Sequence, residues 1–217
     1  MAVQAEIDML GKTHLIVSEA IMSSACLCVP DTLMPLGHTA VFLAGGYFGA
    51  LSPDLDKENT MAAHLFPRVA RYIAKLGHRK WTHTIWALLL LSILPIFCTL
   101  VAIGWKCPNN ESSLPWCFTM AALFLDGFWI GYLLHLLEDN QSVQGVMFLY
   151  PLTHYVVSKN TGHEYKQRPW SRFRYRTGGK AECIIRRIAL IVLLIAMYQL
   201  VGGCYSLLLF GLLFLIL

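Results

Sequence analysis

Long apolar stretches alternate with short polar segments along this chain, which is the pattern of a membrane protein built from helices. The two clearest apolar stretches cover residues 84–105 and 117–137. Each supplies the roughly 20 apolar residues that a helix needs to cross a bilayer. Weaker stretches cover residues 15–29, 37–51, 184–201 and 205–217. The pattern predicts an all-α, polytopic membrane bundle of about six transmembrane helices in a single membrane domain.

Composition points the same way. Hydrophobic residues make up 56% of the 217 residues and charged residues only 14%, and the mean hydropathy is +0.55. A soluble domain of this size could not keep its surface hydrated with so few charges. The first dozen residues contain Glu6 and Asp8 and lack the basic start of a signal peptide, so we expect the first helix to stay in the protein.

Basic residues predict the orientation. Residues 52–81 carry six Lys or Arg and residues 140–187 carry nine, whereas the connection between the two strongest spans has only Lys106. Because basic loops stay on the cytoplasmic side, we expect both basic segments and both termini to be cytoplasmic. The simplest interpretation of both basic segments is attraction to anionic lipid headgroups at the membrane surface. The basic loop 156–182 could also contact nucleic acid, but its position beside a span favours lipid headgroups.

Residues 61–76 lie within the first basic segment and combine apolar and basic positions at helical spacing. Leu65, Val69 and Tyr72 would share one side, and Arg68 and Arg71 the other. We expect an interfacial amphipathic helix on the cytoplasmic membrane face.

The seven cysteines form no zinc-ribbon pair, and five of them lie in or beside apolar stretches. Cys107 and Cys117 flank a short polar segment on the predicted outer side. They would form a disulfide if that compartment is oxidising.

Residues of metal-ligand type occur in four groups, and the predicted topology places all four at the cytoplasmic ends of different helices. Each group alone could be a helix cap or an interfacial side chain. Their shared depth favours one common site, because ionisable groups near a membrane are costly unless they face a polar interior. A His-plus-carboxylate set suits zinc, or manganese or iron if oxygen ligands dominate. The residues are His14, Asp54, Asp56, His78, His83, His135 and Asp139.

The order and spacing of these motifs resemble the LexA-binding, inner-membrane-associated metal-dependent hydrolase family of bacteria and archaea. The resemblance covers residues 10–155 and leaves the residues 183–217, an expected helical hairpin, outside it. It implies a bacterial inner-membrane protein, the seven ligands named above, and a remote similarity to zinc phospholipase C. Two positions depart from the family pattern, namely Lys57 after the Asp pair and Lys80 after His78-Arg79. The motifs are Thr13-His14, Ser52-Pro53-Asp54-Leu55-Asp56, His78-Arg79-x-x-Thr82-His83, Gly131-x-x-x-His135-x-x-x-Asp139 and Gly145-x-x-x-x-Tyr150-Pro151.

The leading hypothesis is a membrane-embedded metal-dependent hydrolase that cleaves a phosphoester of a lipid or lipid-linked substrate at the cytoplasmic membrane face. Glu138 or Asp54 would act as the catalytic base. Arg79 and Lys80 would bind the substrate phosphate.

Two alternatives of other classes stay open. Glu19 and Asp126 lie inside apolar stretches, as the pathway residues of an ion- or proton-coupled transporter would. The basic loop could instead bind a regulatory protein partner, with no catalysis.

Overall fold

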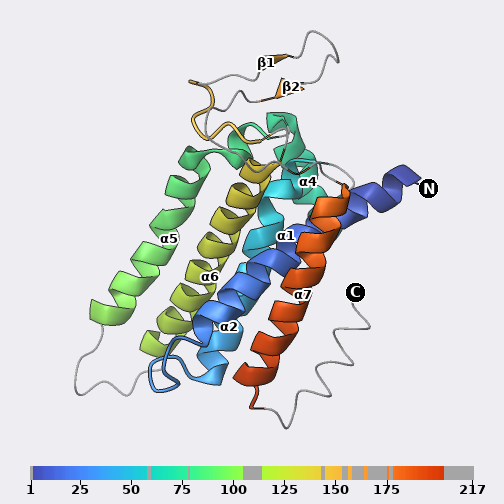
Figure 1. Ribbon diagram of the computed structural model, residues 1–217. Helices are drawn as coiled ribbons and strands as arrows, with labels where there is room; N and C mark the ends of the chain where they lie inside the picture. The colour runs from blue at the N-terminus through green and yellow to red at the C-terminus, as the bar shows by residue number, and fades with distance from the viewer. Residues whose placement is uncertain are drawn as a thin grey trace.

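The computed structural model is a bundle of helices with one very short strand pair (Figure 1). It describes residues 2–57, 60–77, 79–104, 114–142, 145–152, 156–157, 164–165, 175 and 178–202. The long helices are α1 (Ala2–Cys26), α2 (Leu36–Leu51), α5 (Ile85–Gly104), α6 (Leu114–Gln141) and α7 (Lys180–Leu200). Short helices join α2 to α5, namely η1 (Ser52–Asp56), α3 (Met61–Leu65), α4 (Pro67–Ile73), η2 (Ala74–Leu76) and η3 (Trp81–His83).

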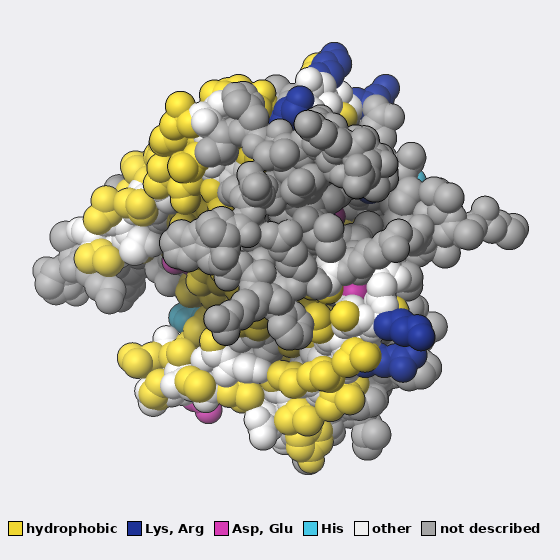
Figure 2. Space-filling model, turned by 45° about the horizontal axis from the view of Figure 1, so that its top comes forward, with side chains coloured by type: hydrophobic (Ala, Val, Ile, Leu, Met, Phe, Trp, Pro, Cys, Tyr) yellow, Lys and Arg dark blue, Asp and Glu magenta, His cyan; other side chains and the backbone are white. Residues whose placement is uncertain are grey.

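Three described helices are long and apolar enough to cross a membrane, namely α5, α6 and α7. Their outer surfaces are apolar, and on α5 the side chains of Leu90 and Leu100 are 69% and 64% exposed. Figure 2 shows hydrophobic side chains spread over much of the described surface, with Lys and Arg in a few groups. Such a surface matches lipid as its solvent.

Five of the six predicted spans fall within the described part of the chain, and three of these five are long and apolar enough to cross a membrane. Helix α2 has 16 residues and is short for a crossing. Helix α1 is longer, but Lys12, His14 and Glu19 interrupt its apolar character. The last predicted stretch, 205–217, lies outside the described residues.

Helices α2 and α6 form the centre of the bundle and touch backbone to backbone. A Cβ added at Gly45 would lie 1.9 Å from the Phe124 carbonyl oxygen, and one at Gly127 would lie 1.9 Å from that of Phe42. Glycine is required at such positions because any side chain would prevent the approach. This contact fixes α6 against the end of α2, from which the next short helix begins.

The predicted interfacial helix over residues 61–76 is interrupted. It breaks at Phe66 (φ −130°, ψ 63°), and Pro67 then starts α4. Ala63 and Ala70 are buried in a cluster against the bundle, and Ile73 packs against that cluster. Val69 is 47% exposed and Tyr72 is 73% exposed.

The all-α fold class is confirmed, and one small element outside the helices was not predicted. Strands β1 (Val156–Val157) and β2 (Glu164–Tyr165) pair antiparallel, with Val156 opposite Tyr165, and lie beyond one end of the bundle (Figure 1). Cys117 is a free, exposed cysteine in the structure, so the predicted disulfide between it and Cys107, which lies outside the described residues, is not formed.

Candidate metal centre

Buried polar side chains converge at one end of the bundle, where η1, η3, the start of α5 and the end of α6 meet. The His135 ring centroid lies 4.2 Å from that of His14 and 5.6 Å from that of His83. Residues separated by more than a hundred positions in the sequence are thus in direct contact. His78 lies outside the described residues. The structure brings together the other six predicted ligands, namely His14 of α1, Asp54 and Asp56 of η1, His83 of η3, and His135 and Asp139 of α6.

The imidazole of His135 is fixed by the end of α2. Its Nδ1 lies 2.7 Å from the carbonyl oxygen of Ala50. A carbonyl oxygen only accepts hydrogen bonds, so Nδ1 carries the proton and Nε2 presents a lone pair. This arrangement is the one by which proteins orient a histidine for a metal.

The lone pair of His135 Nε2 faces carboxylate oxygens. Asp54 Oδ1 lies 3.8 Å from it and Asp139 Oδ2 lies 4.0 Å from it. Within the described part of the chain, both His135 Nε2 and Asp139 Oδ2 are buried without a hydrogen-bond partner. Acceptors that face one another in a buried site repel unless a cation lies between them.

The separations also suit a shared ion. Distances of 3.8 and 4.0 Å are too long for hydrogen bonds, whereas two ligands that each lie about 2.0–2.2 Å from one metal are separated by about 3–4 Å. Two overlapping groups could hold a metal, with ligand atoms all within 4.8 Å of one another. One is His14, His135 and Asp139, and the other is Asp54, His83 and His135.

The two carboxylates of η1 have different surroundings. Helix α2 ends where Pro53 starts η1, and the turn directs Asp54 to His135. Asp56 Oδ2 instead accepts from the Arg79 backbone N–H (2.8 Å) and the Thr82 hydroxyl (2.5 Å). It lies 3.2 Å from His83 Nδ1. Asp56 therefore orients His83, and it does not face the space between His135 and Asp139.

His83 is held so that its other nitrogen points into the cluster. Nδ1 lies 2.9 Å from the Thr82 hydroxyl, and Nε2 lies 3.4 Å from Asp139 Oδ2. Burial lowers the pKa of His83, but the neighbouring carboxylates of Asp139 and Asp56 outweigh burial and raise the pKa to about 9. Without a metal, the His83 imidazole thus carries a second proton, which a metal ion bound through Nε2 would displace.

Glu138, a predicted catalytic base, has both carboxylate oxygens engaged. Oε2 lies 2.9 Å from His14 Nδ1, and Oε1 accepts from the Ser18 hydroxyl at 3.0 Å. His14 Nε2 then lies 3.3 Å from Asp139 Oδ1. These contacts make Glu138 a residue that positions His14.

Arg79, predicted to bind substrate phosphate, is buried instead. Its guanidinium donates to Asp139 Oδ1 at 2.7 Å and to the Ser142 hydroxyl at 3.4 Å. Its backbone has φ +55°, a left-handed conformation that a non-glycine residue adopts only when its contacts enforce it. Lys80, the second predicted phosphate ligand, is exposed.

Comparison with known proteins decides the family. The family model "YdjM inner membrane protein" matches residues 9–216. The chain belongs to this family. It is 27% identical to YvsG of Bacillus subtilis over 146 residues, which cover 67% of this chain and 75% of that protein. It is 29% identical to the inner membrane protein YdjM of Escherichia coli over 102 residues, or 46% of this chain and 44% of that protein. No solved structure matches.

Membership of the YdjM family confirms that this is an inner-membrane protein family, as the sequence resemblance implied. The family match also covers more of the chain than the resemblance did. The matched region includes α7, which the sequence motifs over residues 10–155 did not cover. The family name states no activity, so hydrolysis and LexA binding stay predictions.

The sequence motifs do not identify several residues that position this centre in the YdjM-family chain. Ser18 bonds Glu138, Ser142 bonds Arg79, and the Tyr132 hydroxyl donates to the Thr82 carbonyl oxygen. Ser18 lies four residues after His14, and this helical spacing was the one available signal. The Tyr132 contact had no signal because its partner is a backbone atom.

Proposed function

We propose that this chain is a membrane-embedded metal-dependent hydrolase. Four atoms would hold its metal, namely Asp54 Oδ1, His83 Nε2 and His135 Nε2 of one candidate group and Asp139 Oδ2, which lies 3.4 Å from His83 Nε2. One observation carries the proposal: the buried lone pairs of His135 Nε2 and Asp139 Oδ2 face each other at 4.0 Å with no hydrogen-bond partner in the described region. A cation is the group that satisfies both.

The donor set indicates which metals fit. Two imidazole nitrogens and two carboxylate oxygens at these separations match zinc, which favours four ligands. Manganese or iron is the alternative, because both accept a larger share of oxygen ligands. His14 would stay beside the ion, held by Glu138, and could bind a second ion together with His135 and Asp139.

The chain's own groups then have separate roles. When bound, a divalent metal supplies Lewis acidity, which makes water nucleophilic near neutral pH and polarises the bond under attack. Asp54 has a 14% exposed side chain, whereas Asp139 is 2% exposed, so substrate reaches the centre from the side of Asp54. Asp54 Oδ2, the oxygen not assigned to the metal, is therefore a better placed proton acceptor than Glu138, whose two oxygens contact His14 and Ser18. Lys80 offers a cation to a substrate phosphate, while Arg79 fixes Asp139.

The substrate class follows from the location. The centre lies where the candidate span α5 begins and the candidate span α6 ends. The end of a span is the depth of lipid headgroups. A phosphoester on a lipid or lipid-linked molecule could reach Asp54 sideways from the membrane.

Metal analysis of detergent-purified protein with matched variants tests this proposal. His135→Ala should lose the metal and the hydrolysis of a chromogenic phosphodiester, and it should keep its helical circular dichroism, because alanine favours helix. His38→Ala is the control, since His38 lies twelve residues before Ala50 on α2, about 18 Å along the helix. Retention of metal by His135→Ala, or equal loss in both variants, would contradict the proposed site.

A second function is favoured by Glu19. Its Oε1 is buried in α1 with no hydrogen-bond partner among the described residues, and a Cβ at Gly46 of α2 would lie 3.1 Å from it. An unsatisfied carboxyl five residues from His14 suits a proton or cation pathway that leads away from the centre. Proton flux into protein-containing liposomes, lost in Glu19→Gln and kept in His38→Ala, would support it. No flux above empty liposomes would remove it.

A further inference from the structure

Helix α4 and turn η2 present an unusual surface beside the metal centre. The buried side of α4 is small: Ala70 packs in one cluster with Leu51, Leu55 and Ala63. Both α4 and η2 contact η1, the element that carries Asp54 and Asp56. Ile73 also packs against this cluster, whereas Arg68, Val69, Arg71 and Tyr72 are exposed and do not hold the fold together.

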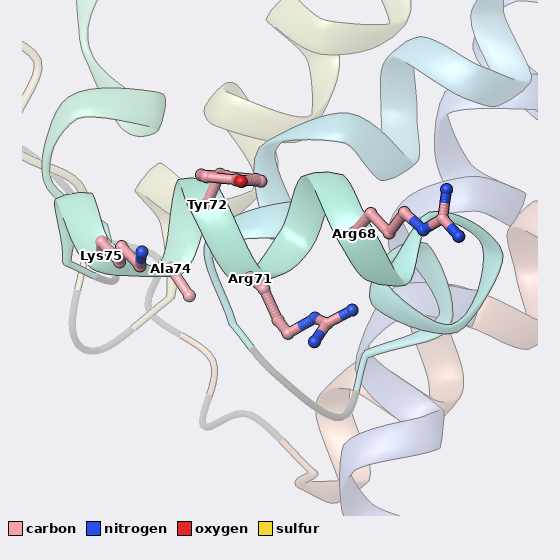
Figure 3. Close-up of a pocket in the computed structure, with 5 residues that line it drawn as sticks. All are labelled: Arg68, Arg71, Tyr72, Ala74 and Lys75. Atoms are coloured by element: carbon pink, nitrogen blue, oxygen red, sulfur yellow. The ribbon is translucent and has the colours of Figure 1, made fainter.

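One outward side is basic. Arg68, Arg71 and Lys75 are exposed, and together with Tyr72 and Ala74 they line a pocket of about 600 Å³ (Figure 3). Figure 3 shows Arg68 and Arg71 extending away from the helix axis and Lys75 at the other end of the segment. Wherever the structure describes the chain, no Asp or Glu forms an ion pair with these three cations.

The spacing of these charges is unfavourable without a bound anion. Residues three and four apart on a helix are neighbours, so Arg71 repels both Arg68 and Lys75. The aromatic ring of Tyr72 offsets little of this, with Lys75 Nζ at 5.1 Å from its centroid. An anion with several acceptor oxygens would remove the repulsion, and phosphate is such a group that both Arg and Lys recognise.

The neighbouring side of α4 is apolar. Val69 and Tyr72 are exposed beside the cations, and Leu65 at the end of α3 is 48% exposed. A soluble phosphate compound would leave these side chains in water. A phospholipid would cover them with its acyl chains and place its phosphate among the cations.

The level of α4 in the bundle supports the same ligand. Figure 1 shows α4 at the end of the bundle where α5 and α7 begin and α6 ends. Since α5, α6 and α7 are the candidate spans, this end lies at the depth of lipid headgroups.

We propose that α4 and η2 bind the phosphate of an anionic phospholipid, with Arg68, Arg71 and Lys75 around the phosphate and Leu65, Val69 and Tyr72 among the acyl chains. The site is separate from the metal centre and does not depend on hydrolysis. Because α4 and η2 pack on η1, the bound lipid also anchors the turn that presents Asp54 to the membrane surface.

Native mass spectrometry of the full chain, released from detergent and titrated with phosphatidylglycerol or phosphatidylcholine, tests the proposal. The triple variant Arg68→Gln, Arg71→Gln, Lys75→Gln should bind phosphatidylglycerol about 100-fold more weakly, at about fivefold for each charge removed. The control variant Lys180→Gln, Arg186→Gln, Arg187→Gln removes the same charge at the start of α7, and it should bind normally. Equal affinity for both lipids in the unchanged chain, or equal losses in both triple variants, would overturn the proposal.

Two further arms separate the lipid from other causes. Val69→Ser with Tyr72→Ser should weaken phosphatidylglycerol binding and leave the helical circular dichroism unchanged, because both side chains are exposed. Glycerol phosphate should not displace the lipid, and displacement would indicate a soluble phosphate ligand instead. Binding should persist after chelator treatment, so a failed lipid site and a failed metal site give different results.

Discussion

The α2–α6 pair has two regions that are built in opposite ways. Around Gly45 and Gly127 the two backbones touch, and no space is left even for a Cβ. Around Ala50 and His135 the same two helices are joined by one hydrogen bond, beside acceptor atoms that face each other at 3.8 and 4.0 Å. The first region is complete as it stands, whereas the second holds buried groups that need a ligand.

This difference separates fold from function along one helix pair. Close packing at the glycines holds α6 in place with no polar contribution. His135 lies four residues after Gly131, and the close packing holds its Nδ1 at hydrogen-bond distance from the Ala50 carbonyl oxygen. Substitutions at the glycines should therefore act on folding, and substitutions at the polar end should act on ligand binding.

The largest effect should come from the packed region. Gly127→Val would place a side chain 1.9 Å from the Phe42 carbonyl oxygen, and backbone atoms cannot move away cheaply. We expect little folded protein, measured by monodisperse yield after detergent extraction. Gly37→Val is the control, because nothing lies within 4 Å of a Cβ at Gly37. Normal yield of Gly127→Val would show that the two helices do not touch there.

Arg79→Ala should have the next largest effect. It leaves the carboxylate of Asp139, which is 1% exposed, without the cation at 2.7 Å. Removing one partner of a buried ion pair costs about 3–5 kcal/mol. Chemical unfolding of the metal-free protein should show this loss, and saturating zinc should recover part of it by supplying another cation near Asp139. Lys80→Ala is the exposed control, and an equal loss of stability there would contradict the assignment.

Glu138→Gln should reduce the affinity for a second metal ion, the one that His14 would bind with His135 and Asp139, about 10–100-fold with little loss of folded protein, because Glu138 orients His14. Its side chain lies 2.9 Å from His14 Nδ1, and the amide lacks the negative charge that holds this imidazole. Competition titration against a zinc-binding dye measures the effect. Glu182→Gln is the control, since Glu182 is buried but accepts a hydrogen bond from Gly178 at the start of α7. Unchanged affinity in Glu138→Gln would exclude His14 from the metal's surroundings.

Tyr132→Phe should have the smallest effect, about 1 kcal/mol in the free energy of unfolding, because one hydrogen bond to the Thr82 carbonyl oxygen is lost. Metal affinity should fall only slightly, since His83 keeps its contacts with Asp56 and with the Thr82 hydroxyl. A loss of metal as large as in Glu138→Gln would mean that Thr82 depends on Tyr132 for its position.

The sequence predicted the apolar helices and the polar cluster for related reasons. Helices α5 and α6 differ by only a few residues from the predicted stretches 84–105 and 117–137, because a long apolar run has few alternatives to a membrane helix. The convergence of His14, His83 and His135 followed from common depth, which requires no knowledge of side-chain geometry.

Other features depend on contacts that the sequence pattern does not contain. Asp54 and Asp56 look equivalent in sequence, yet the turn η1 directs one to His135 and the other to the Arg79 backbone. Arg79 looked available for phosphate, but its positive φ turns it inward to Asp139. The span count failed because α2 ends after 16 residues, where Pro53 starts η1, and because Lys12, His14 and Glu19 interrupt the apolar character of α1.

X-ray absorption spectroscopy at the zinc edge, on detergent-purified protein loaded with one equivalent of zinc, tests the central claim most directly. The four proposed ligand atoms predict two imidazole nitrogens and two carboxylate oxygens at about 2.0–2.2 Å, and His135→Ala should lose one imidazole contribution or the metal itself. Zinc that is surrounded by oxygen alone, bound through sulfur, or unchanged in its spectrum by His135→Ala would contradict the site.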